Sequence, residues 1–232
     1  LLYSVWVVLA GFQNCSQANF KTSAASLAYQ SCTQQLGSTT LPIKVMFVAD
    51  TSGSNAGSGG SDPSKAVRGG SIAQFFTTYR ARSNFAWGFL YFSGSTATSL
   101  IGGTSAPQFT ANASQMQQAV SAFYGVQDYG LTPYMAAINM ARQAIQGDSA
   151  APSNTKYVVV FLSDGLPDPV VDDATLRAGV QALLGVRTGQ VSFNAIYYGD
   201  ADAAANARLK MMAAAGSGQF LDTNNNPTGK QF

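Results

Sequence analysis

The chain has 232 residues and contains no histidine. Histidine is the usual general base near neutral pH and the commonest zinc ligand, so its absence excludes Ser-His-Asp and Cys-His catalysis and histidine-based zinc sites. No Gly-Lys-Ser/Thr follows the glycines at residues 59–60, so there is no phosphate-binding loop there. We therefore expect no catalytic residues, no organic cofactor and no enzymatic activity.

Charged residues are also scarce. They make up 10% of the sequence, whereas soluble domains contain about one quarter. Much of the surface must therefore consist of Ser, Thr, Asn, Gln and Gly, a composition that is common outside the cytosol. The formal net charge is only +2. With no cluster of Lys and Arg and no stacked aromatic motif, the sequence gives no support for nucleic-acid binding.

The sequence has only two cysteines, Cys15 and Cys32. They do not form a CxxC motif, and without histidine they make a poor metal site. We interpret them as a disulfide, which implies an oxidising compartment. Two free thiols are the alternative, because pairing cannot be read from a sequence alone.

No apolar run is long enough to cross a bilayer as a helix, which takes about 20 residues. Residues 1–10 (LLYSVWVVLA) are apolar but too short, and they lack the basic region of a secretory signal. Asn14 precedes Cys15, where a lipid-attachment cysteine would follow a small residue. We interpret residues 1–10 as a mature segment that packs on the folded domain or on a partner, including a partner in the cell envelope.

From residue 43 onward, short apolar runs alternate with helical patterns. We expect strands at residues 43–49, 85–92, 96–101, 157–162, 191–198 and 219–221. Strands that alternate with helices predict an α/β domain with a doubly wound parallel sheet and helices on both faces. We place this domain at residues 43–222, after an N-terminal segment at residues 1–42 and before a C-terminal tail at residues 223–232.

Polar residues follow two of these strands, at the edge where open α/β sheets bind ligands. The first strand is followed by the motif DxSxS and the strand at residues 157–162 by SDG, while a helical run after residue 129 opens with GLTP. Carboxylates and hydroxyls, without nitrogen or sulfur ligands, suit a hard divalent cation. The candidate ligands are Asp50, Ser52, Ser54, Thr132 and Asp164.

These three motifs, in this order, resemble those of the von Willebrand factor A domain family over residues 43–222. The resemblance implies that the five candidate residues hold Mg²⁺, or else Mn²⁺ or Ca²⁺, in a metal-ion-dependent adhesion site. It implies direct contacts from Ser52, Ser54 and in some members Thr132, contacts through water from the two aspartates, and one position for a partner's Asp or Glu carboxylate. It also implies a mostly parallel sheet with one antiparallel edge strand, at residues 96–101.

Each motif also has an interpretation without a metal. The DxSxS loop could use its side chains to satisfy backbone donors. Thr132-Pro133 could be a plain helix start, as we expect for Asp62-Pro63, and the SDG sequence could be an ordinary turn.

The sequence therefore predicts a metal-dependent protein–protein interaction or adhesion module, similar to stand-alone bacterial A-domain proteins that are secreted or bound to the envelope. Its expected location is extracytoplasmic, in the periplasm, at the outer membrane, on the cell surface or secreted. The expected partner is a protein ligand or assembly subunit that offers a carboxylate. The alternative is a structural subunit of a larger envelope or surface assembly in which the metal site is incidental. A metal-dependent phosphotransferase or hydrolase is a third hypothesis, which the absence of histidine disfavours.

The pairing of Cys15 with Cys32 is directly testable in protein taken from its native compartment. After alkylation without reductant, mass spectrometry should find neither cysteine labelled. In the chain-entropy model, closing this short loop stabilises the protein by about 3 kcal/mol, so reduction should lower the free energy of unfolding. Two labelled thiols would remove this argument for an oxidising compartment.

Overall fold

The computed structural model describes residues 41–103, 105–200 and 202–225. Three sequence predictions lie outside these residues. They are the packing of residues 1–10, the disulfide between Cys15 and Cys32, and the last seven residues of the C-terminal tail. These three stay predictions.

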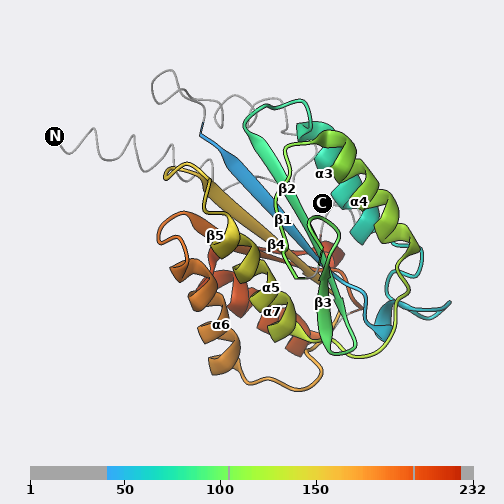
Figure 1. Cartoon of the computed structure of the whole chain (residues 1–232). Coiled ribbons are helices and arrows are strands. Elements are labelled where there is room, and N and C mark those ends of the chain that lie inside the picture. Colours follow the sequence, from blue (N-terminus) through green and yellow to red (C-terminus); the bar gives the residue numbers. More distant parts are fainter. Residues whose placement is uncertain (1–40, 104, 201, 226–232) are drawn as a thin grey trace.

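A six-stranded sheet forms the centre of the domain (Figure 1). The strands are β1 (Ile43–Asp50), β2 (Phe85–Ser93), β3 (Thr96–Ser99), β4 (Lys156–Ser163), β5 (Val191–Tyr197) and β6 (Ser217–Asp222). Their order is β3-β2-β1-β4-β5-β6, and all neighbours run parallel except β2 and β3. The prediction of a mostly parallel sheet with one antiparallel edge strand is confirmed.

Helices cover both faces of this sheet, as the sequence predicts (Figure 1). The five α-helices of the described residues are α3 (Arg68–Tyr79), α4 (Ala113–Gly125), α5 (Tyr134–Gly147), α6 (Asp173–Gly185) and α7 (Ala203–Ala215). α3 and α4 enclose one apolar core against the sheet, and α5, α6 and α7 enclose the other. None of the helices in the described part of the chain is both long and apolar enough to span a membrane.

β1 is buried on both faces, which explains its unbroken apolar sequence. Phe47 lies in the core beneath α3 and α4, its neighbour Val48 lies in the opposite core, and both are 0% exposed. β1 pairs with β2 and β4, and Ala49 is opposite Leu162 of β4. Neighbouring parallel strands end at the same edge of a sheet, so the polar residues that follow β1 and β4 meet there.

Two helices begin later than the sequence predicts. α3 begins at Arg68 rather than after Asp62-Pro63, and α5 begins at Tyr134 rather than at Thr132. The Asp62 carboxylate still accepts hydrogen bonds from the backbone N–H groups of Val67 (3.1 Å) and Arg68 (2.9 Å). It therefore caps α3 from outside the helix, because the buried Arg68 side chain also holds it there through Nε at 3.0 Å.

A buried cluster of charges fastens the loop that follows β1. Arg68 is 0% exposed, and its guanidinium donates to Asp62 and to both carboxylate oxygens of Asp128, at 2.9 and 3.1 Å. It also donates to the backbone carbonyl of Asp50 at 2.6 Å. Lys65 donates to Asp128 at 3.3 Å and to the Val126 carbonyl at 2.8 Å. The cluster thus ties the loop before α3 to the loop after α4.

This cluster predicts a large difference between buried and exposed ion pairs. Asp62→Ala leaves the buried Arg68 guanidinium short of a partner, so it should lower the free energy of unfolding by about 3–5 kcal/mol. The control is Asp173→Ala, because Asp173 pairs with Arg208 at 3.0 Å but is 56% exposed; its loss should cost about 1 kcal/mol or less. Urea denaturation of both variants measures the difference. Equal losses would contradict a structural role for the cluster.

Candidate functional site

Asp50 is fully buried at the end of β1, at the carboxyl edge of the sheet. It belongs to a polar cluster that also contains Ser52, Ser54, Ser163 and Asp164. Its Oδ1 accepts a hydrogen bond from the backbone N–H of Ser52 at 2.8 Å, and its Oδ2 accepts one from the Ser163 hydroxyl at 2.5 Å. Burial and the neighbouring negative charge of Asp164 raise the pKa of Asp50 to about 7, although the two hydrogen bonds act in the opposite direction. The fold therefore holds a carboxylate whose ionisation is unfavourable and which a nearby positive charge would stabilise.

A chain of hydroxyls connects the loop after β1 to the loop after β4. The hydroxyl oxygens of Ser52 and Ser54 lie 3.0 Å apart, and Ser54 donates to Oδ1 of Asp164 at 2.9 Å. The second oxygen, Oδ2 of Asp164, is buried and accepts no hydrogen bond from the described residues. Asp164 as a whole is only 7% exposed, so water has little access to it. A buried carboxylate oxygen without a donor is costly and indicates a place for a ligand.

Thr132 lies in a third loop at the same edge and is 8% exposed. Its backbone pairs with that of Asp168 through two hydrogen bonds of 2.9 and 3.1 Å. The loop touches both of the others, because Gly53 N–H donates to the Gly130 carbonyl at 3.0 Å and the Tyr134 hydroxyl donates to the Gly165 carbonyl at 2.6 Å. Within the described residues, however, no hydrogen bond joins the Thr132 hydroxyl to the other four candidate ligands.

Sequence reasoning missed the residues that hold these loops in place. Asn55 is buried in the short 3₁₀ turn Gly53–Asn55 and accepts a hydrogen bond from the Tyr198 hydroxyl at 2.9 Å. A Cβ atom on Gly199 would overlap the carbonyl oxygen of Asp164, so only glycine fits there. The one available sequence signal is position, since Tyr198 and Gly199 stand at the end of a predicted strand, as the candidate ligands do.

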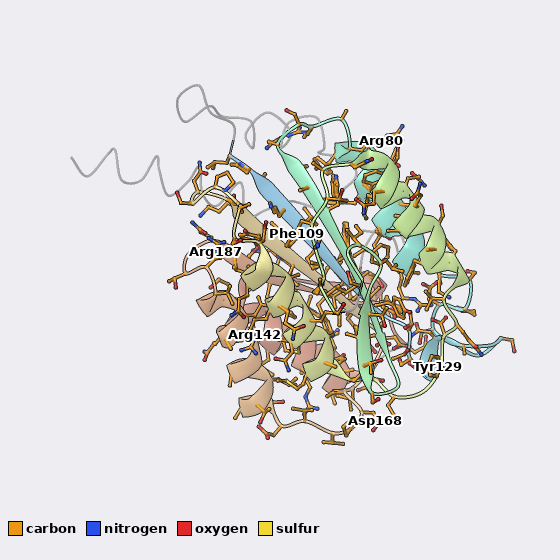
Figure 2. The ribbon with its side chains drawn as sticks, in the orientation of Figure 1. Arg80, Phe109, Tyr129, Arg142, Asp168 and Arg187 are labelled. Carbon is orange, nitrogen blue, oxygen red and sulfur yellow. The ribbon has the colours of Figure 1, made fainter. Side chains whose placement is uncertain are left out.

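Large apolar side chains are exposed at the same edge. The described residues expose five such side chains, and four of them lie on the two loops that carry Thr132 and Asp164. Figure 2 shows Tyr129 and Asp168 at this end of the molecule, away from Arg80 at the other end. We call these four side chains the loop-edge surface: Tyr129 (55% exposed), Leu131 (44%), Leu166 (39%) and Val170 (87%).

The described residues contain no group of three or more His, Cys, Asp or Glu side chains that could hold a metal ion. The polar cluster has two carboxylates, from Asp50 and Asp164, and its other side-chain oxygens are the hydroxyls of Ser52, Ser54 and Ser163. Oxygen donors of this kind fit hard cations such as Mg²⁺ and Ca²⁺. A cation at this place would therefore bind to hydroxyl and carboxylate oxygens together, with only two formal negative charges.

The order and direction of the strands define a doubly wound α/β domain, and solved bacterial surface proteins share this fold. No protein-family model and no curated protein sequence matches the chain. A mutant of the PilB minor pilin from Streptococcus sanguinis is similar with a TM-score of 0.54 and 12% identity, over 82% of this chain and 59% of that chain. The pilus adhesin SpaC from Lactobacillus rhamnosus GG is similar with a TM-score of 0.57 and 16% identity, over 82% of this chain and 29% of that chain. Identities this low show the shared fold alone, and the chain spans less than two thirds of either protein.

These findings correct the predicted membership of the von Willebrand factor A family, which is wrong. No family model matches the chain, the similar structures are a minor pilin and a pilus adhesin, and the described residues hold no acidic metal-binding group. The physical reason is that Asp, Ser, Thr and Gly are ordinary loop formers. Here Asp50 accepts the Ser52 N–H within its own loop, as such residues do at many strand ends. The motifs locate a polar edge without identifying a family.

The raised pKa of Asp50 predicts how stability depends on pH when no divalent cation is present. The pKa is 3.8 for an exposed carboxyl and about 7 in the folded protein, so the folded state binds more protons between these values. Stability should therefore fall as pH rises from about 4 to about 7. Asp50→Asn should remove this dependence and stabilise the protein at pH 8, by at most about 4 kcal/mol for about three pH units.

Urea unfolding in EDTA across this pH range measures the effect. The control is Asp168→Asn, which changes an exposed carboxylate at the same edge and should keep the wild-type pH dependence. Identical pH profiles for the wild type and Asp50→Asn would show that burial of Asp50 does not set the stability in this range.

Proposed function

We propose that this chain is a protein-binding domain of a bacterial cell-surface assembly, located outside the cytoplasm, and that it binds rather than catalyses. The observation that carries the proposal is the loop-edge surface, whose four exposed apolar side chains lie on the loops that carry Thr132 and Asp164. The fold that the chain shares with a minor pilin and a pilus adhesin supports the same conclusion. So does the low content of charged residues, which is 10%.

The loop-edge surface has the properties of a contact site for a protein. Apolar side chains that are exposed together, rather than singly, mark interaction surfaces. Tyrosine is also enriched among the residues that contribute most to binding, and Tyr129 is 55% exposed. The two loops that present the surface are joined by the backbone pair of Thr132 and Asp168. A partner therefore meets a preformed surface, which limits the entropy lost on binding.

Replacement of exposed apolar side chains tests this role. The double variant Leu166→Ser, Val170→Ser should reduce incorporation of the protein into cell-surface complexes at least about tenfold, since a loss of ~1.4 kcal/mol suffices. The control is Tyr124→Ser, which removes a 46% exposed side chain that lies on the helix α4 and on neither of the two loops. Fractionation of surface-extracted protein by size measures incorporation. Equal incorporation of the double variant and the wild type would contradict the proposal.

We further propose that a divalent cation, Mg²⁺ or else Mn²⁺ or Ca²⁺, binds at Asp50, Ser52, Ser54, Thr132 and Asp164. The supporting observation is the buried Oδ2 of Asp164, which has no donor. A second is the raised pKa of Asp50, because a cation would favour its ionised form. Ser52 links the two carboxylates, because its backbone N–H donates to Asp50 and its hydroxyl lies 3.0 Å from that of Ser54, which donates to Asp164. A single ion at this place would offset both charges.

In this proposal the serines and the aspartates of the cluster have different roles. The serine hydroxyls are neutral donors, and the two aspartates supply the negative charge. The Ser163 hydroxyl and the Ser52 N–H each donate a hydrogen bond to the Asp50 carboxylate and hold it in one orientation. The lone pairs that accept neither hydrogen bond therefore also have a fixed direction. When bound, the cation would supply surplus positive charge next to the two loops that carry the loop-edge surface. A partner protein's Asp or Glu carboxylate is the complementary group.

Mn²⁺ titration by calorimetry tests the cation. Asp164→Asn removes the negative charge but keeps an oxygen that can accept from Ser54, so the domain should fold and its affinity for Mn²⁺ should fall at least about tenfold, or ~1.4 kcal/mol. The control is Asp168→Asn, an exposed carboxylate of the same loop, which should leave the affinity unchanged. Equal affinity in the two variants would place any cation elsewhere.

The effect of a chelator separates the two parts of the proposal. If EDTA releases the protein from its surface complexes, the cation takes part in the contact. If the complexes resist EDTA but are lost in the Leu166→Ser, Val170→Ser variant, the chain is a structural subunit that assembles through apolar contacts and its cation site is incidental.

A further inference from the structure

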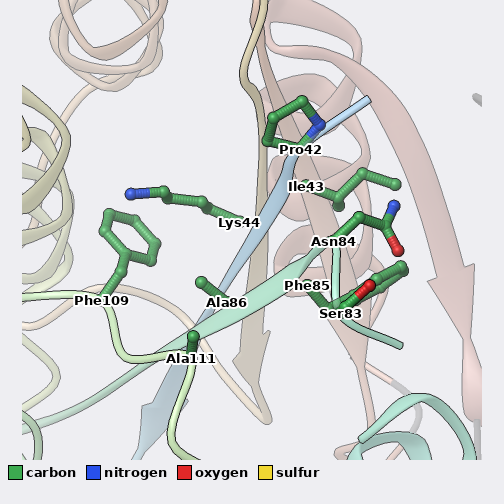
Figure 3. A pocket seen from close by; sticks show the side chains of 9 residues that line it. All are labelled: Pro42, Ile43, Lys44, Ser83, Asn84, Phe85, Ala86, Phe109 and Ala111. Atoms are coloured by element: carbon green, nitrogen blue, oxygen red, sulfur yellow. The ribbon is translucent and has the colours of Figure 1, made fainter. Parts of the chain in front are cut away.

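A pocket lies at the opposite end of the sheet from the polar cluster, where β1 and β2 begin (Figure 3). Its volume is about 450 Å³, within the range of roughly 300–1,000 Å³ that is typical of ligand pockets. Three segments form it: the entry to β1, the start of β2 and the connection from β3 to α4. The residues that line it include Pro42, Ile43, Lys44, Ala86, Phe109 and Ala111.

The pocket favours an apolar occupant. Of the described residues that line it, only Lys44 is charged, and its Nζ is paired with Asp148 at 2.6 Å. The same Nζ lies 5.5 Å from the centre of the Phe109 ring, so its charge is already balanced within the domain. Phe109, Ile43 and Ala86 are all partly exposed. Apolar surface of this kind is stabilised when another apolar group covers it.

The chain itself enters the domain at the rim of this pocket. Pro42 and Ile43 line the pocket, and the forty residues that precede Leu41 are joined to the domain at this point. Among them, residues 5–9 (VWVVL) form an unbroken apolar run. About thirty residues separate this run from the rim, and at roughly 3.3 Å per residue they are more than long enough to return to it. The tether also gives the run an effective concentration in the millimolar range.

We propose that the apolar run at residues 5–9 docks into this pocket of its own domain, with Trp6 as its largest contact. The docked run would cover the partly exposed Phe109 and Ile43, and it would remove its own five apolar side chains from water. This contact lies at the opposite edge of the sheet from the loop-edge surface, so it leaves that surface free. The proposal does not depend on the cation or on the proposed function.

Fluorescence quenching by acrylamide of the 232-residue chain tests this contact. The chain has two tryptophans, Trp6 and Trp87, and Trp87 is 1% exposed, so quenching reports on Trp6. In the wild type we expect weak quenching. Ala111→Asp places a charge at the exposed rim of the pocket and should increase the quenching constant several-fold. The matched control, Ala122→Asp on the exposed face of α4, should leave it unchanged.

A second variant approaches the contact from the other side. Val7→Asp changes none of the residues that line the pocket, and it should also increase the quenching of Trp6. Sedimentation velocity over a range of concentrations then identifies the source of the docked run. A protected Trp6 in a monomer supports the proposal. A Trp6 that is protected only in dimers would assign the pocket to a second copy of the chain and overturn it. Strong quenching of the wild type, or no response to Ala111→Asp, would also overturn it.

Discussion

β1 exchanges hydrogen bonds with β2 on one side and with β4 on the other, and helices cover both of its faces. From Val45 to Asp50 the strand is buried, so its backbone groups there are satisfied only when both neighbours keep their register. That register brings the ends of β1 and β4 together and places Asp50 beside Ser163. The burial that stabilises the centre of the sheet therefore also removes the Asp50 carboxylate from water and raises its pKa.

Two groups of buried charges lie near the end of β1, and they are satisfied differently. In the first group, Arg68 and Lys65 form ion pairs with Asp62 and Asp128. In the second group, the Asp50 and Asp164 side chains accept hydrogen bonds from hydroxyl groups, and no Lys or Arg of the described residues forms an ion pair with them. The charges of Arg68 and Lys65 are balanced within the fold, whereas those of Asp50 and Asp164 are not. An external cation would therefore gain most beside these two carboxylates. This contrast, rather than the sequence motif, is the physical argument for a ligand at that edge.

The two edges of the sheet offer two kinds of contact. The carboxyl edge presents the loop-edge surface and the polar cluster, on loops that are held together by the Thr132–Asp168 pair and by the Tyr134–Gly165 hydrogen bond. The amino edge presents a partly apolar pocket where residues 1–40 join the domain. A subunit arranged in this way can retain its own N-terminal segment at one end while its other end meets a partner.

The sequence by itself determined the strands, their mostly parallel direction and the position of the polar edge. It could do so because the runs at residues 43–50 and 156–163 are local, and two-sided burial in a parallel sheet makes them apolar throughout. The tertiary structure alone decided which groups meet, because those contacts join distant residues: Ser54 bonds to Asp164 across 110 positions. It also decided that Asp62 pairs with Arg68 and that Thr132 pairs with Asp168 instead of capping α5. It left four large apolar side chains exposed on the loops that carry Thr132 and Asp164. Short motifs of loop-forming residues carry too little information to fix these pairings or a family, since desolvation and contact depend on what the rest of the chain brings to the same place.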